Sequence, residues 1–228
     1  MGVGVLAVGG GVGMLINMRN GLMAGKRLPY DAEVEYLEST GTQWIDTGEV
    51  WQLGDTVRIE TAQTRVRDQA AFGVSARIYG FSNNTDSYSS NNRAFFWGNS
   101  PYTGGSSTAL PANYGTTRHV IAVNADTCNV DGTVISGSVT TTTSDSLHTI
   151  PLFCRVGNAA TTTINKPYYG RIYWWKHYRS GTLVRDMIPV RVGSVGYMYD
   201  RVSGRLFGNA GTGAFTYGND LKYPIPSE

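Results

Sequence analysis

Charge, cysteine and histidine are all scarce in this chain of 228 residues, which has 16% charged residues, two cysteines and three histidines. The 19 basic and 17 acidic residues nearly cancel, and they are spread along the chain. No broad basic surface is therefore predicted to hold phosphates by counterion release, and nucleic acid is a poor candidate partner.

The few cysteines and histidines also limit the chemistry. Cys128 and Cys154 each fall in a predicted strand, where buried free thiols are favoured over a bridge, although the bridge stays open. The cysteines and histidines lack the spacing of zinc ligands, and no cofactor motif occurs, so we expect no cofactor.

Residues 1–27 form a glycine-rich, apolar N-terminal arm without a charged residue through Ile16. The first basic residue, Arg19, follows the apolar run, an order that counts against a signal peptide. Gly9, Gly10 and Gly11 interrupt a run already shorter than a membrane span. We favour an arm that packs into other subunits; a membrane-interacting segment and a disordered leader remain alternatives.

Beyond the arm the composition is typical of an all-β protein. The chain has 29 Gly and 14 Tyr, which suits short strands joined by tight turns. Residues 56–62 alternate between apolar and polar side chains, as in a half-buried strand. Residues 168–191 predict a hairpin whose turn lies at Arg179, Ser180 and Gly181. We expect one folded domain over residues 28–228.

Two polar segments, residues 82–92 and 99–114, are predicted to be long surface loops, and they flank a short aromatic strand at residues 93–98. Farther along, Asp131-Gly132 is a strong signal for a two-residue hairpin turn. The glycine-rich C-terminal region predicts hairpins that close against the rest of the domain.

Two sets of segments carry a resemblance. HVIAVNADTCNVDGTVI, IPLFCRVGN and YYGRIYWWKHY occur in an order similar to the later part of laminin G-like domains, which have the concanavalin A-like fold. LPYDAEVEYLESTGTQWIDTG and GTLVRDMIPVRVGSVGYMYDRVSGRLFGNAGTGAF resemble segments of uncharacterised structural proteins of gut bacteriophages and prophages. The resemblance implies an antiparallel jelly-roll β-sandwich.

The same resemblance implies a function without catalysis. We expect a virion structural protein, such as a head fibre, decoration or tail-associated protein, at the surface of the phage particle. The arm would contact other virion proteins, the sandwich would face outward toward glycans, and the protein would form homo-oligomers. A cell-surface or secreted bacterial carbohydrate-binding module is the alternative, and a glycoside hydrolase is less favoured.

Laminin G-like domains often hold calcium at a rim, but no dedicated acidic cluster matches here. Asp126 and Asp131 lie in a turn that Asp favours for local reasons. A structural calcium therefore stays open without assigned ligands.

Catalytic groups are hard to find. Glu33, Glu35 and Glu38 are the one dense acidic set, with Glu38 expected at a turn, and the paired-carboxylate pattern of glycosidases is absent. The three histidines fall in different predicted strands or strand edges, and no nucleophile elbow lies near them. A structural or surface role is favoured for His119, His148 and His177.

Glycan binding needs an exposed aromatic face bordered by amides and hydroxyls. The first candidates lie in or beside the two polar loops: Tyr79, Tyr88, Trp97 and Tyr102. The alternative is that Trp97 belongs to the core and that the loop is a solvated connection. Strand periodicity also puts Trp174 and Trp175 on opposite faces of one strand, so that one of them is available to a partner, a ligand or a covering segment.

Overall fold

The computed structural model describes residues 28–52, 54–65, 69–74, 79–84, 93–98, 107–109, 117–124, 128–135, 148–156 and 164–227. These residues form strands, turns and irregular segments, so the expected all-β class is confirmed for them. The arm at residues 1–27 lies outside the described residues. No helix that could span a membrane occurs in the described part of the chain.

The larger sheet has 11 strands, and most of them follow one hydrogen-bonded path. In spatial order this path is β11 (Thr133–Ile135), β10 (Cys128–Val130), β9 (His119–Val123), β4 (Asp55–Gln63), β15 (Tyr169–Arg179), β16 (Thr182–Val192), β17 (Val195–Asp200) and β18 (Arg205–Phe207). Off this path, β2 (Leu37–Thr40) pairs with β15 and β19 (Thr216–Tyr217), and β1 (Ala32–Glu33) pairs with β16. All of these pairings are antiparallel.

The second sheet has eight strands. Its path runs through β14 (Ile164–Pro167), β13 (Cys154–Val156), β5 (Gln69–Val74), β6 (Tyr79–Asn84), β7 (Arg93–Gly98) and β8 (Ser107–Ala109), while β12 (Thr149–Leu152) pairs with β3 (Ile45–Val50) and β5. The short contact of Val156 with Val74 is parallel, and the other described pairings are antiparallel. Strand β8 corrects the sequence prediction, because it lies within the segment expected to be a loop.

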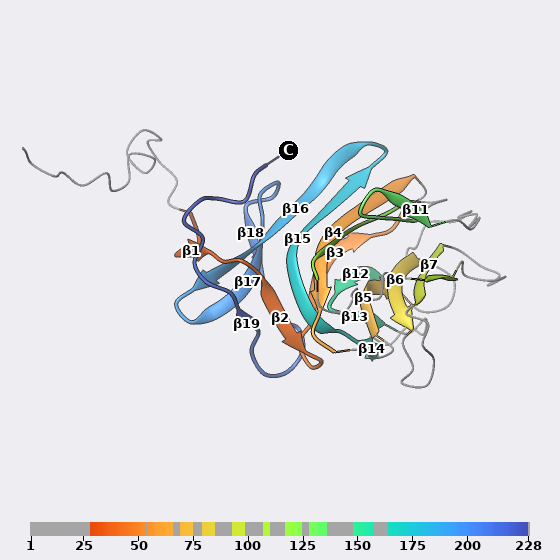
Figure 1. The fold of residues 1–228 in the computed structure, drawn as a ribbon. Coiled ribbons are helices and arrows are strands. Elements are labelled where there is room, and N and C mark those ends of the chain that lie inside the picture. The colour runs from red at the N-terminus through yellow and green to blue at the C-terminus, as the bar shows by residue number, and fades with distance from the viewer. Residues whose placement is uncertain are drawn as a thin grey trace, which may run out of the picture.

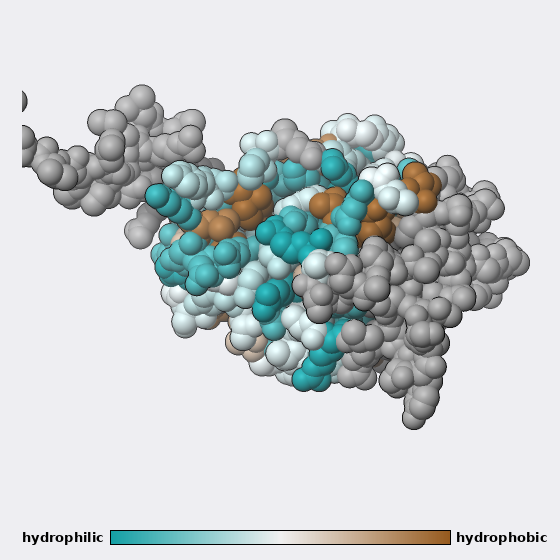
Figure 2. Space-filling view, in the orientation of Figure 1, coloured by the Kyte–Doolittle hydropathy of each residue, from teal (hydrophilic) through white to brown (hydrophobic). Residues whose placement is uncertain are grey.

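The core lies where the two sheets meet, and it is built from the inward side chains of both. Ile59 and Trp175 of the larger sheet belong to one buried cluster with Phe72 and Leu152 of the smaller one. Figure 1 shows the long β15–β16 hairpin crossing the molecule, with β5, β6, β12 and β13 to one side of it. On the face seen in Figure 2 the described residues present a mainly hydrophilic to neutral surface with smaller hydrophobic patches. Two antiparallel sheets around a shared core are consistent with a β-sandwich.

The cysteines occupy different sheets, with Cys128 on β10 and Cys154 on β13. Both are buried free thiols, as the sequence predicted. Burial raises the pKa of the Cys128 thiol to about 12, and it raises the pKa of Cys154 as well. These residues therefore act as small apolar side chains of the core.

Turn chemistry fixes the register of two hairpins. Ser180 and Gly181 join β15 to β16 and have φ of 47° and 81°, and Asp131 and Gly132 join β10 to β11 with φ of 51° and 85°. Two consecutive residues with positive φ form the turn that matches the twist of a two-residue hairpin. Both turns lie where the sequence predicts them.

The C-terminal segment closes over the start of the domain. After β18 the chain turns back, so that Ala210 N donates to Trp44 O at 2.8 Å and Thr212 N donates to Thr42 O at 3.0 Å. Farther on, Leu221 N donates to Glu33 O at 2.8 Å. The two ends of the described chain thereby support each other, and they leave β15 in the interior of the larger sheet.

Candidate functional site

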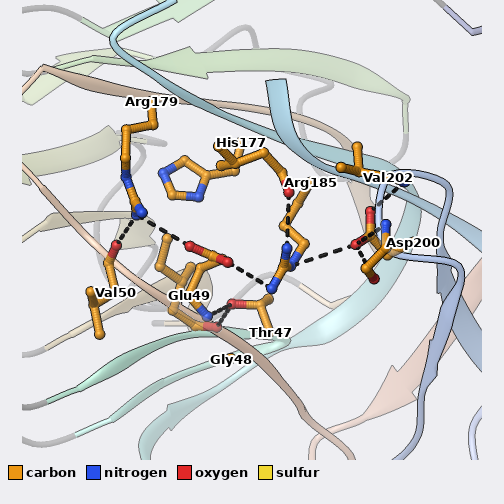
Figure 3. A network of polar contacts seen from close by, with 12 residues as sticks. Thr47, Gly48, Glu49, Val50, His177, Arg179, Arg185, Asp200 and Val202 are labelled. Carbon is orange, nitrogen blue, oxygen red and sulfur yellow. Dashed lines mark hydrogen bonds and ion pairs between the residues drawn. The ribbon is translucent and has the colours of Figure 1, made fainter. Parts of the chain in front are cut away.

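A buried polar network crosses the space between the two sheets (Figure 3). At its enclosed end, His177 Nε2 on β15 lies 2.7 Å from Asp55 Oδ2 on β4, and neither side chain is exposed. An ionised carboxylate only accepts, so the imidazole donates this bond. Gln52 N also donates to Asp55 Oδ2 at 2.8 Å, which fixes the carboxylate at the start of β4.

Glu49 on β3 connects this pair to the opposite end of the network. Its Oε2 accepts from Arg179 at 3.2 Å, and its Oε1 lies 2.6 Å from NH2 of Arg185. Arg179 also approaches Asp55 Oδ1 at 3.4 Å, and Arg185 approaches Asp200 Oδ2 at 3.6 Å. Acidic and basic groups therefore alternate from β4 through β15, β3 and β16 to β17.

The network is better suited to bracing the fold than to chemistry. Glu49 belongs to the eight-stranded sheet and its arginine partners to the larger one, so the ion pairs connect the two sheets. Its carboxylates are held by fixed donors, and the Asp55–His177 pair is closed to solvent. A catalytic carboxylate must instead reach its substrate. We therefore assign a structural role to His177, one of the two roles that the sequence analysis favoured for it.

A second histidine is held at the β10–β11 turn. His119 Nδ1 lies 2.6 Å from Asp131 Oδ2, and His119 Nε2 lies 2.7 Å from Thr117 Oγ1. Asp131 also accepts from Val120 N at 2.8 Å. A hydroxyl, an imidazole and a carboxylate lie in the order of a catalytic triad. The carboxylate, however, ties a residue of positive φ back to β9, so this arrangement holds the turn in place.

The acidic residues of the first strands are engaged with different partners. Glu33 accepts from Ile225 N at 2.8 Å, Glu35 accepts from Asn219 N at 3.3 Å, and Glu38 accepts from Arg171 Nε at 2.6 Å. Glu38 lies within β2, not at the turn where it was expected. Within the described residues no group of three or more His, Cys, Asp or Glu side chains could hold a metal ion, and Asp126 lies outside them.

The outer face of the larger sheet offers a more accessible arrangement, centred on a β-bulge in β15. The register with β4 shifts between Ile172 and Trp174, so Tyr173 is the extra residue. Ile172 and Trp175 are both fully buried in the core. The two residues between them, Tyr173 and Trp174, therefore both lie on the outer side, where strict alternation would place one.

Charged groups surround this aromatic pair. The guanidinium of Arg118 lies over the Tyr173 ring, 3.7 Å from its centroid, and Arg118 Nε lies 2.8 Å from Glu60 Oε1. The edge of Tyr36 meets Tyr173 with the ring centroids 5.6 Å apart. Burial raises the pKa of the Tyr173 hydroxyl. We name this outer group the β15 face: Tyr36, Tyr173 and Trp174 with Arg118 and Glu60, in which Tyr36 and Trp174 are half-buried and Tyr173 is nearly covered.

The two described residues of the predicted glycan platform belong to the smaller sheet, not to the β15 face. Tyr79 lies in β6 and Trp97 in β7, where Tyr79 pairs with Gly98 and Trp97 with Gly80. Tyr88 and Tyr102 lie outside the described residues. The backbone thus brings Tyr79 and Trp97 onto neighbouring strands of the smaller sheet, and the four-residue platform stays a prediction.

Sequence reasoning identified the contrast between Trp174 and Trp175, which the structure confirms, because Trp175 is fully buried and Trp174 is half-buried. It missed the roles of Tyr36, Tyr173 and Arg118. Aromatic density in residues 168–178 was the available signal, but only the bulge reveals which aromatic residues share a face. The partners come from strands far apart in sequence.

No family model matches the chain, and no curated protein matches it.

Proposed function

We propose that this chain is a non-enzymatic jelly-roll protein of a phage particle, with a lectin-like β-sandwich that binds glycans on its outward surface. Two antiparallel sheets around one core support the fold class. The resemblance of residues 28–48 and 181–215 to phage structural proteins supports the particle. The concanavalin A-like or laminin G-like topology is part of the same proposal.

The observation that carries glycan binding is the bulge at Tyr173. It places Tyr173 and Trp174 together on the outer side of β15, beside Arg118, Glu38 and Glu60, where Trp174 is half-buried and Tyr173 is only 7% exposed. Sugars are bound by aromatic faces that cover the apolar side of the ring and by polar groups that bond its hydroxyls. The β15 face contains both kinds of group within one sheet.

The polar-loop platform remains a second candidate for the same ligands. Tyr79 and Trp97 lie on paired strands at successive register positions, with Tyr79 opposite Gly98 and Trp97 opposite Gly80. Tyr88 and Tyr102 complete the set that the sequence predicts. A particle that displays many copies needs only weak binding at each, because multivalency raises the overall avidity.

A role without catalysis is supported by the fixed positions of the acidic side chains. Asp55 and Glu49 are tied into the network between the sheets, and Glu38 is tied to Arg171. The arrangement favours binding over the paired free carboxylates that glycoside hydrolysis uses.

Assembly is assigned to the N-terminal arm, residues 1–27, through contacts with other virion proteins, and homo-oligomers are part of this proposal. The alternative is a cell-surface or secreted bacterial carbohydrate-binding module. Mass spectrometry of purified phage particles separates the two, because the chain should be present in the particles at structural copy number. Its presence only in the cell envelope or medium would favour the alternative.

The binding proposal is tested by a glycan-array screen of the full chain, multimerised so that weak contacts register. Trp174→Ala tests the β15 face, while Trp97→Ala and Tyr88→Ala test the polar-loop platform. We expect selective binding that Trp174→Ala reduces. If only the Trp97 and Tyr88 variants lose glycan binding, the binding site lies in the polar-loop platform. If the wild type binds none of the plant, host and bacterial glycans, glycan binding is refuted.

A further inference from the structure

The β15 face carries a repeated pairing of a basic side chain with an aromatic ring. Four such pairs follow the strand from its first residues to its centre: Arg65 with Tyr169 at 5.0 Å, Arg171 with Tyr36 at 4.3 Å, Arg118 with Tyr173 at 3.7 Å and Lys176 with Trp174 at 5.7 Å, each measured to the ring centroid. A cation within about 6 Å of a ring centroid is attracted by the ring's negative face. Lys176 is only 4% exposed, so the accessible positive charge along the strand comes from Arg65, Arg118 and Arg171.

Arg118 and Arg171 are each held by two contacts, one with an aromatic ring and one with a carboxylate. Arg118 lies on Tyr173 and contacts Glu60 through Nε, while Arg171 lies over Tyr36 and donates from Nε to Glu38. The hydrogen bond to Glu38 raises the pKa of Arg171. Their side chains are nevertheless 54% and 37% exposed. A guanidinium held flat in this way loses little further freedom when it binds an anion.

The stacking of the arginines on the tyrosine rings also determines which ligands the β15 face can bind. Arg118 and Arg171 cover one side of Tyr173 and Tyr36, so a sugar ring has less free aromatic area there than the residue types alone would imply. Guanidinium groups instead match carboxylate and sulfate groups, which they bind through two parallel hydrogen bonds. Trp174 remains the broad apolar surface for the sugar ring.

We infer that the β15 face binds an acidic polysaccharide, with Arg118 and Arg171 taking its carboxylate or sulfate groups and Trp174 contacting the sugar. This inference rests on the proposed glycan binding and names the substrate class. The accessible charges agree with it, since Arg65, Arg118 and Arg171 outnumber the carboxylates of Glu38 and Glu60, while the buried Lys176 lies opposite Asp186.

A nucleic acid fits the same face less well. Each strand carries a phosphate about every 3.4 Å, and the carboxylates of Glu38 and Glu60 lie beside the arginines that would have to bind this dense charge. Bases also need free aromatic faces for stacking, and the guanidinium groups occupy part of them. A polysaccharide with spaced charges avoids both conflicts.

The test measures binding of the full chain to four immobilised probes: polygalacturonate, dextran sulfate, neutral dextran and oligo-dT. The variants are Arg118→Ala, Arg171→Ala and Arg118→Lys, which keeps the charge but not the flat guanidinium. Arg205→Ala is the matched control, because it removes an exposed arginine from β18, the edge strand at the end of the same sheet's path. Thermal unfolding checks that each variant is folded.

We expect the acidic polysaccharides to bind and the neutral one not to bind. Arg118→Ala and Arg171→Ala should each weaken binding about tenfold, a loss that matches one charge-assisted contact. Arg118→Lys should recover only part of it, and Arg205→Ala should bind like the wild type. Preference for carboxylate or sulfate in this comparison identifies the acidic group.

Other results overturn the inference in distinguishable ways. Equal losses in Arg205→Ala, or full binding by Arg118→Lys, would reduce the effect to general charge attraction. Tighter binding of oligo-dT would assign the face to nucleic acid. Binding of neutral sugars alone would refute the acidic ligand but agree with the proposed glycan binding. If the chain binds no saccharide, neither among the immobilised probes nor on the glycan array, both the acidic ligand and glycan binding are refuted.

Discussion

His177 and Asp55 form a pair closed off from solvent, with Nε2 of His177 2.7 Å from Oδ2 of Asp55 and both side chains 0% exposed. Burying a polar group without a hydrogen-bond partner costs free energy, and each of these two residues provides the partner that the other needs in the core. Arg179 and Gln52 bind the same carboxylate. Asp55 therefore holds together the start of β4 and the end of β15.

Asp55→Ala is expected to lower the free energy of unfolding by about 3–5 kcal/mol, because it leaves His177 buried without its acceptor. Urea unfolding monitored by tryptophan fluorescence measures the change. Asp46→Asn is the control, since Asp46 is exposed on β3, the strand that precedes β4 in sequence, and an Asn can still accept from Gly48 N. A loss below about 1 kcal/mol for Asp55→Ala would show that the pair is not a fold constraint.

Glu49 is expected to couple the two sheets through Arg179 and Arg185. Glu49→Gln and Arg185→Gln should each cost about 1–2 kcal/mol, a value reduced from that of a buried pair because these side chains are 15% and 18% exposed. The double variant should cost less than the sum of the two single variants. Strict additivity in this double-mutant cycle would mean that the contact carries no energy.

The adjacent tryptophans of β15 are expected to separate binding from stability. Trp175→Ala should destabilise the fold by about 3–5 kcal/mol, since Trp175 is 0% exposed in the core. Trp174→Ala should leave the urea midpoint close to that of the wild type and reduce glycan binding. A destabilisation by Trp174→Ala as large as that by Trp175→Ala would place Trp174 in the core and remove it from the β15 face.

Much of the fold could be predicted from local patterns, because alternation and turn residues act over short distances. The sequence predicted the Ser180-Gly181 and Asp131-Gly132 turns. It also predicted the strand in which buried Val57 and Ile59 alternate with Arg58 and Glu60. Strand β8 was not, because its three residues, Ser107 to Ala109, carry too short a pattern to stand out from a polar loop.

The candidate site could be predicted only in part. Alternation correctly separated Trp174 from Trp175, but a bulge adds one residue and moves Tyr173 onto the same side as Trp174. Nothing local in residues 168–178 signals that shift, because it depends on the register with β4. The contacts of Arg118 with Tyr173 and of Glu49 with Arg185 join distant segments, so only the folded chain reveals them.

Gly211 is expected to be required for the return of the C-terminal segment. A Cβ at this position would collide with the backbone oxygen of Thr42, so one of the two backbone segments would have to move. Gly211→Ala should therefore break the contact of Thr212 N with Thr42 O and lower the thermal midpoint. Gly181→Ala is no clean control because Gly181 has a positive φ, whereas Ala214→Ser changes an exposed neighbour without a new contact. Equal midpoints for Gly211→Ala and Ala214→Ser would contradict the close packing of this segment.

Cys128 is expected to make stability depend on pH in the alkaline range. Its pKa is raised by burial from 9.0 to about 12, so above pH 9 the unfolded chain loses the thiol proton while the folded chain keeps it. The folded state then binds more protons, and stability falls as pH rises between the two pKa values, by about 1.4 kcal/mol per pH unit from this group. Urea unfolding of the wild type and Cys128→Ala between about pH 8 and about pH 10.5 isolates this effect, because other titrating groups are common to both. The advantage of the wild type should shrink with rising pH; a constant difference would mean that the thiol is not buried as its surroundings indicate.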